Sequence, residues 1–237
     1  MCEGKSGSLT GRDRPDLGKI YTGVDNYYTA RVTRHGATPL GVDWSCQATQ
    51  ALRFVQLLKV CDFSEAFSLN DVGCGYGALV PFLAARHPGC KIDYLGIDLS
   101  RAMIGRARRR FAGPQCRFAV SAKSPRIADY TVASGVMNVN VGYSRQDWEM
   151  FIESMLRQIH ETSRRGFAVN FMIADSEPGA DDQSDRMRLY KTIPEPWIRF
   201  CQAELKCSVE LVNNYGMKEF TLLVRRDAAA ASNTLQH

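Results

Sequence analysis

The sequence has 237 residues, of which 45% are hydrophobic and 23% charged, and its formal net charge is +5. These values are ordinary for a globular domain, and no apolar run reaches the roughly 20 residues that a membrane-spanning helix needs. The eight cysteines include no Cys-x-x-Cys pair and there are four histidines, so a zinc site is disfavoured. With no apolar signal core near the N-terminus, we expect a cytoplasmic protein with free thiols and no bound metal.

The chain divides into four zones. They are a polar flexible arm over residues 1–17, a helical cap over 18–62, a main domain over 63–227 and a flexible tail over 228–237. The cap ends in an amphipathic helix, whose apolar residues recur every three or four positions and for which Ser45 is a plausible N-cap. The segment before that helix is rich in aromatic residues and is interpreted as a lid.

Strand and helix patterns alternate through the first part of the main domain. Strands are expected over Phe67–Val72, Ile92–Ile97, Arg117–Val120, Tyr130–Val136 and Phe167–Met172, and helices over Ala78–Arg86, Arg101–Phe111 and Ser144–Ser163. Such alternation predicts right-handed βαβ units, and therefore a mostly parallel sheet with helices on both faces.

The last part of the main domain has a different pattern. A turn-rich acidic loop over Ala174–Ser184 precedes a helix over Glu195–Leu205. Two strands follow, Cys207–Val212 and Glu219–Val224, and the short turn between them predicts an antiparallel hairpin.

A glycine-rich loop follows the first expected strand. It reads Asp71-Val72-Gly73-Cys74-Gly75-Tyr76-Gly77, and Asp98 ends the second strand twenty-one residues later. Glycine permits positive φ and lets a ligand approach the backbone closely. An acid at the end of the second strand can accept hydrogen bonds from both hydroxyls of an adenosine ribose. The combination predicts a nucleotide-type cofactor at the carboxyl edge of the sheet.

Two kinds of cofactor fit such a loop. A dinucleotide favours Gly-x-Gly-x-x-Gly, but Gly77 comes one residue early for that pattern, and Asp71 would repel a pyrophosphate. The same acid suits the ammonium group of S-adenosylmethionine (SAM), which is therefore preferred.

Three segments resemble a known family. Asp71–Gly77 and Ile97–Ser100, with Met103 and Ala107 after them, resemble motifs I and II of the class I SAM-dependent methyltransferases, and Ala133–Val136 resembles their strand-four motif. The N-terminal block around Arg34-His35-Gly36 is similar to bacterial enzymes of this superfamily. The resemblance implies an α/β fold with a Rossmann-like, doubly wound, seven-stranded sheet that is mostly parallel and ends in an antiparallel hairpin.

The resemblance also implies roles for individual residues. Gly73 and Gly75 would face the methionine moiety and the ribose, and Asp71 would hold the ammonium. Asp98 would bind the ribose, while Leu99 and Met103 would pack on the adenine. One position departs from the family pattern, since Ser121-Ala122-Lys123 stands where an acid or amide often reaches the adenine. The expected cofactor-binding residues are Asp71, Gly73, Cys74, Gly75, Asp98, Leu99, Met103, Ser121, Ala122 and Ser134.

The methyl acceptor is harder to place. Asn138 could orient an acceptor or cap a turn, and His35 could act as a base or be an ordinary surface histidine. The substrate-pocket candidates are Tyr28, Trp44, Asn138 and Tyr215, for which ordinary packing is equally good. No cluster of acids follows the fourth strand, so we expect transfer without a metal.

Five arginines lie close together at positions 101, 106, 108, 109 and 110. They could contact RNA phosphates, but a solvated helix face explains them better. The sequence therefore predicts methyl transfer from SAM to a nitrogen or oxygen of a small molecule by in-line displacement, with S-adenosylhomocysteine (SAH) as product. The alternatives are an RNA-modifying methyltransferase, an NAD-dependent oxidoreductase and a non-catalytic SAM-binding regulator. The sequence does not indicate an oligomeric state.

Overall fold

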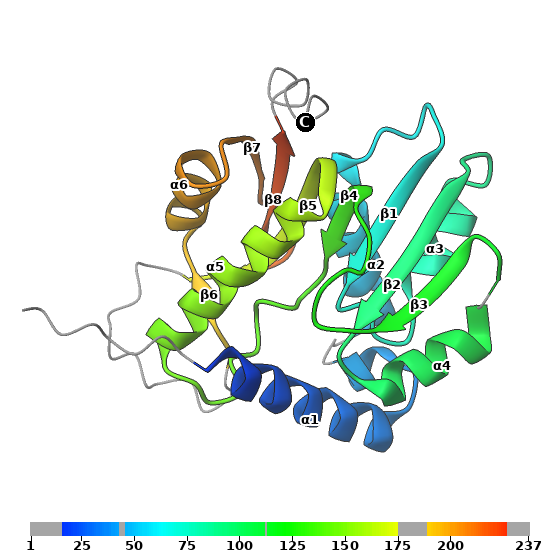
Figure 1. Ribbon diagram of the computed structural model, residues 1–237, viewed down its shortest axis with the longest axis horizontal. Helices are drawn as coiled ribbons and strands as arrows, with labels where there is room; N and C mark the ends of the chain where they lie inside the picture. Colours follow the sequence, from blue (N-terminus) through cyan, green and yellow to red (C-terminus); the bar gives the residue numbers. More distant parts are fainter. Residues whose placement is uncertain (1–15, 43–45, 112, 175–188, 227–237) are drawn as a thin grey trace, which may run out of the picture.

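The computed structural model describes residues 16–42, 46–111, 113–174 and 189–226 as an α/β fold with one central sheet (Figure 1). Its strands are β1 Phe67–Val72, β2 Ile92–Asp98, β3 Cys116–Val120, β4 Ala128–Ala133, β5 Ser163–Ile173, β6 Lys191–Thr192, β7 Cys207–Val212 and β8 Glu219–Arg226. Its helices are α1 Leu17–His35, α2 Gln47–Leu57, α3 Leu79–Arg86, α4 Arg101–Phe111, α5 Arg145–Glu161 and α6 Pro194–Ala203, with short 3₁₀ turns η1 Pro39–Val42 and η2 Leu58–Val60.

The sheet has the order β3-β2-β1-β4-β5-β8-β7, and β6 pairs with β5 off this path. Strands β1 to β5 pair in parallel, while β8 runs antiparallel to both β5 and β7. The predicted fold class is therefore confirmed. The addition is β6, which has two residues and is too short to carry a sequence signal.

Both faces of the sheet are buried, and the strands show why. Along β5, Phe167, Val169 and Phe171 pack with α5 and α6, while Ala168 between them packs on the opposite face with α2 and α3. Alternate residues of a strand point to opposite faces, so a strand with apolar residues throughout needs a helical layer on each side. Figure 1 shows the sheet between α5 and α6 on one face and α2 and α3 on the other.

The ends of two elements differ from prediction for identifiable reasons. β4 ends at Ala133 rather than Val136, because Gly135 turns the chain with φ 75°. β5 begins at Ser163, within the stretch expected to close α5; the polar Ser163-Arg164-Arg165 segment gives no strand pattern. α5 itself begins as expected, with the Ser144 hydroxyl accepting a hydrogen bond from the Asp147 amide at 3.1 Å.

The expected N-terminal cap proves to contain two different parts. α1 is a long helix, begun by the Asp16 side chain, that crosses the end of the sheet beside α4 and α5 (Figure 1). Its Thr29 hydroxyl lies 2.6 Å from that of Ser100, and its Tyr21 ring meets Phe151 edge-on at 5.2 Å. α2 instead packs against β5 and β8, so it belongs to the layer that covers the sheet.

Several predictions fall outside the described residues. They concern the arm up to residue 15, the acidic loop from residue 175 and the tail. Ser45 also lies outside the described residues, but the prediction that it caps α2 is wrong, since the N-cap of that helix is Cys46, without a side-chain cap hydrogen bond. Within the described part of the chain, no helix combines the length and apolar character needed to cross a membrane.

Candidate active site

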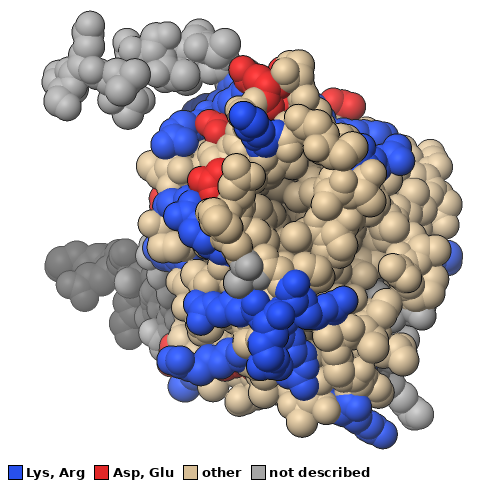
Figure 2. All heavy atoms as spheres, turned by 90° about the vertical axis from the view of Figure 1, so that its right-hand side faces the viewer, with Lys and Arg blue, Asp and Glu red and all other residues tan. Residues whose placement is uncertain are grey.

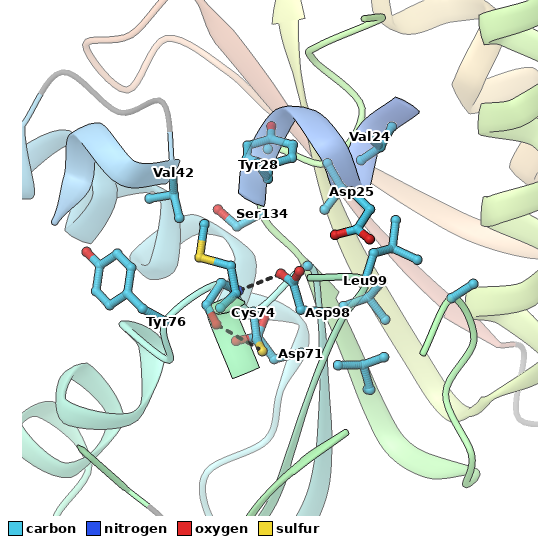
Figure 3. Close-up of a pocket in the computed structure, with 18 of the residues that line it drawn as sticks. Val24, Asp25, Tyr28, Val42, Asp71, Cys74, Tyr76, Asp98, Leu99 and Ser134 are labelled. Carbon is cyan, nitrogen blue, oxygen red and sulfur yellow. Dashed lines mark hydrogen bonds between the residues drawn. The ribbon is translucent and has the colours of Figure 1, made fainter. Parts of the chain in front are cut away.

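A cavity lies at the carboxyl ends of β1, β2 and β4, beneath α1 (Figure 3). It contains about 990 Å³ of space between protein atoms, part of it open to solvent. Open α/β sheets bind ligands at this edge, because the loops that leave neighbouring strands diverge there. α1 adds a wall that the sheet alone does not provide.

The glycine loop forms the floor of the cavity with its backbone. Gly73 and Gly75 both have positive φ, 73° and 55°, and the Gly73 amide donates to the Ile97 carbonyl at 2.8 Å. A Cβ at Gly73 would lie 2.1 Å from Val136, and one at Gly75 would lie 2.9 Å from Val42. Side chains are therefore excluded here, and the backbone itself is presented to the ligand.

Asp98 is held by two backbone amides at the end of β2. Its carboxylate accepts hydrogen bonds from the Ser100 amide at 2.8 Å and the Gly75 amide at 2.9 Å. Loss of solvent and, to a smaller degree, the nearby carboxyl of Asp25 nevertheless raise the pKa of Asp98 to about 6, against the lowering effect of the backbone amides. Among the described residues, Asp98 therefore has no cationic side chain paired with it.

Asp71, at the end of β1, lies deeper in the protein. It accepts a 2.6 Å hydrogen bond from the Tyr94 hydroxyl, yet burial raises its pKa to about 7, with a smaller contribution from Asp98. Two neighbouring carboxyl groups that both resist ionisation favour a ligand that brings positive charge.

All of the expected cofactor-binding residues line this one cavity. Ser134 adds a further sign of a ligand, because its hydroxyl oxygen is buried and makes no hydrogen bond within the described residues. Next to it, the Gly135 amide donates to Asn170 at 2.8 Å, and Asn170 in turn donates to Glu219 at 3.0 Å. Glu219 is bound by the buried Arg53 of α2, so a polar network supports this loop from behind.

The expected acceptor residues are not gathered in the same way. Tyr28 does line the cavity. Asn138 does not, since it is buried and its side-chain oxygen accepts a hydrogen bond from the Met172 amide at 3.1 Å. His35 ends α1 away from the cavity wall, and Tyr215 lies 3.2 Å from the Thr221 hydroxyl, also outside it. Trp44 lies outside the described residues.

Sequence reasoning missed several residues of the wall. They are Tyr21, Val24 and Asp25 of α1, Gln50 and Phe54 of α2, and Phe151 and Met155 of α5. The α1 residues could have been found from their spacing, because Tyr21, Asp25 and Tyr28 recur at the spacing of one helical face. The sequence predicted a helical cap over residues 18–62, with Tyr28 as a pocket candidate, but this helical face was given no role, because the face mixes polar and aromatic residues and has no apolar stripe.

The residues present fit SAM. The cavity is lined by three carboxyl groups, and no lysine, arginine or histidine stands among its described lining residues. SAM carries two positive groups, a sulfonium and an ammonium, and a single carboxylate. Its net charge is therefore positive and can offset the negative charge of Asp71 and Asp98. The described residues contain no group of three or more His, Cys, Asp or Glu side chains that could hold a metal ion.

Comparisons with known proteins agree with this geometry. A family model described as a methyltransferase domain matches residues 70–166. A Mycobacterium tuberculosis protein named as a methyltransferase, Rv1506c, is 39% identical over 170 residues, which cover 71% of this chain and 99% of that protein.

Solved structures show the same fold at low sequence identity. Human N-acetylserotonin methyltransferase in complex with SAM has a TM-score of 0.53 at 18% identity, covering 88% of this chain and 69% of that one. The complex of DhpI with SAH has a TM-score of 0.55 at 15% identity, covering 88% and 98%. The matched domain contains the glycine loop and Asp98, the residues on which the resemblance was founded. The chain belongs to the class I SAM-dependent methyltransferases, with SAM as methyl donor and SAH as product.

Proposed function

We propose that this enzyme methylates a nitrogen or oxygen of a small-molecule acceptor, without a metal. The observation that carries the proposal is the form of the site: the cofactor residues and the α1 side chains line a single cavity with a helix across it. A helix in that place suits an acceptor that fits inside, rather than an extended strand of nucleic acid. The fold can serve such chemistry, since one structural neighbour is named for the small acceptor N-acetylserotonin.

Each part of the cavity has a separate task in this proposal. Gly73 and Gly75 would give the methionine end of SAM close access to backbone, and Asp98 would accept hydrogen bonds from the ribose. Leu99 and Met103 would pack on the adenine, near Ser121 and Ala122. When bound, SAM supplies a methyl group on a sulfonium, which is already activated for displacement.

The protein's own contribution is then mainly alignment. Holding the acceptor atom in line with the methyl group converts an encounter in solution into a reaction between fixed partners, which is worth several kcal/mol of the barrier. Ser134 and Val136, which follow β4, line the cavity together with residues of α1 and with Phe151 of α5. These groups can fix the acceptor and exclude water.

Calorimetry with SAM and with SAH tests the proposal. We expect both to bind folded protein, and we expect Asp98→Ala to weaken SAM binding by at least about tenfold, since it removes a charge-assisted contact. Glu161→Gln is the matched control, because Glu161 is an exposed acid at the end of α5, away from the cavity. Absence of SAM and SAH binding in the wild-type protein would overturn the proposal.

A further inference from the structure

The cavity contains more carboxyl groups than the positive charge of SAM can neutralise. Asp71 and Asp98 belong to the motifs that bind SAM, but Asp25 comes from α1 and has no counterpart in those motifs. SAM has only one positive charge more than its own carboxylate. With no basic residue among the described lining residues, the third carboxyl is left for a different ligand.

Asp25 is held in place rather than free to turn away. One of its oxygens accepts a hydrogen bond from the Thr29 hydroxyl at 3.0 Å, and Thr29 in turn lies 2.6 Å from the Ser100 hydroxyl, at the start of α4. Asp25 forms no ion pair with any described residue. Figure 3 shows its carboxyl group directed into the cavity, on the same side as Asp98.

This placement is unfavourable unless a cation is present. Asp25 is close enough to Asp98 to raise its pKa, so the two carboxyl groups repel each other across the cavity. Apart from Asp25, the residues that α1 and α5 contribute to the cavity are apolar or aromatic: Tyr21, Val24, Tyr28, Phe151 and Met155. In such surroundings charges interact more strongly than in water, so a cationic ligand gains and an anionic ligand is repelled.

We infer that the methyl acceptor is a hydrophobic amine, whose basic nitrogen pairs with Asp25 while its apolar part contacts the aromatic wall. This inference rests on the proposed function and selects nitrogen over oxygen as the methylated atom. An ammonium group has no lone pair, so it must lose a proton before transfer, and the Asp25 carboxylate can accept that proton. Acceptors with a carboxylate or phosphate beside the reacting atom are excluded by the same charges.

Binding to the SAH-saturated protein tests the inference without relying on turnover. The probes are sets that share one arylethyl group and differ in the terminal group: 2-phenylethylamine, 2-phenylethanol and 3-phenylpropanoate, and the three corresponding naphthyl compounds. We expect the amine of at least one set to bind about tenfold or more tighter than its alcohol, as one charge-assisted contact implies, and the carboxylate to bind weakest.

The variant Asp25→Asn should remove this preference. We expect it to lose at least about tenfold in amine affinity and less than about twofold in affinity for the alcohol and for SAH, because the apolar wall and the motif residues are unchanged. Glu161→Gln makes the same change of charge outside the cavity and should behave as wild type. The wild-type comparison of amine with alcohol stands even if Asp25→Asn does not fold.

Three results would overturn the inference. The first is a wild-type protein that binds no amine, or binds the alcohol as tightly as the amine. The second is an amine preference that persists in Asp25→Asn. The third is a loss of SAH affinity in that variant as large as the loss of amine affinity, which would assign Asp25 to the ribose of the donor. In all three cases the wild-type protein still binds SAM. Absence of SAM binding by the wild type would instead contradict the proposed function.

Discussion

At the scale of single residues, the raised pKa values of Asp71 and Asp98 have a consequence for stability. Both groups ionise near pH 4 in an unfolded chain, but at about 7 and about 6 in the folded protein. Between these values the folded state holds more protons than the unfolded state, so the free energy of unfolding falls as pH rises through that window.

We expect the loss to be on the order of 1 kcal/mol or more between about pH 4 and pH 7, since one unit of pKa shift corresponds to about 1.4 kcal/mol. Urea unfolding at a series of pH values measures it. Asp98→Asn cannot ionise at this position and should show a shallower slope from pH 5 to 7. An identical slope in wild type and variant would contradict the assignment of the effect to Asp98.

Gly73 provides a second prediction at this scale. Ala at this position must adopt a φ of 73° and place its Cβ 2.1 Å from Val136. Gly73→Ala should therefore cost about 1–3 kcal/mol of stability and abolish SAM binding, because the loop has to move. Denaturant unfolding and calorimetry measure the two effects. Gly89→Ala is the matched control, since a Cβ there meets nothing within 4 Å, and it should bind SAM as wild type does.

At the scale of elements, the sequence predicted those with strong patterns and missed those without. β1, α4 and β7 have the bounds expected, because apolar spacing and flanking turns agree there. α1 was expected only as part of a helical cap over residues 18–62, without bounds of its own, because it fully buries only Ile20 and Val32 and so shows no apolar stripe. For the same reason Asp25 was not among the expected site residues, although Tyr28 on the same helix was.

The link between α2 and β8 could not be predicted either. Arg53 and Glu219 are far apart in the sequence, and nothing in either segment indicates that they meet. The fold brings them together only because α2 packs across β5 and β8. The cofactor motifs needed no such knowledge, since their parts lie on consecutive loops that parallel strands place at one edge.

A double-mutant cycle tests this buried pair. Arg53 and Glu219 are both nearly inaccessible to solvent, and the Arg53 Nε donates to Glu219 Oε2 at 2.6 Å. Removing one partner leaves the other charge buried, so Arg53→Met and Glu219→Leu should each cost roughly 3–5 kcal/mol. The double variant should cost clearly less than the sum, because no charge is left alone. Urea unfolding of the four proteins gives the coupling energy, and additive losses would show that the pair is not coupled.

At the scale of the whole molecule, the positive charge is distributed unevenly. Figure 2 shows a patch of Lys and Arg side chains on the side of the molecule that carries α4 and β3. On α4, Met103, Ile104 and Ala107 are buried, and Arg101, Arg108, Arg109 and Arg110 are exposed. None of the α4 arginines forms an ion pair with a described residue. The helix is thus amphipathic, with its arginines on the solvent side, and such a face needs no ligand to explain it.

Binding of RNA distinguishes a solvated face from a nucleic-acid surface. Backbone contacts alone give weak affinities, typically about 10⁻⁴–10⁻⁶ M at physiological salt, which fall steeply as salt rises. We expect a short single-stranded RNA to bind no more tightly than this at about 150 mM salt, as fluorescence anisotropy would show. The double variant Arg101→Ala, Arg109→Ala should reduce the salt dependence of this residual binding and leave SAH affinity unchanged, since neither arginine lines the cavity. Tighter binding that the double variant abolishes would instead identify α4 as a binding site for RNA. The proposed acceptor would then be a nucleic acid rather than a small molecule.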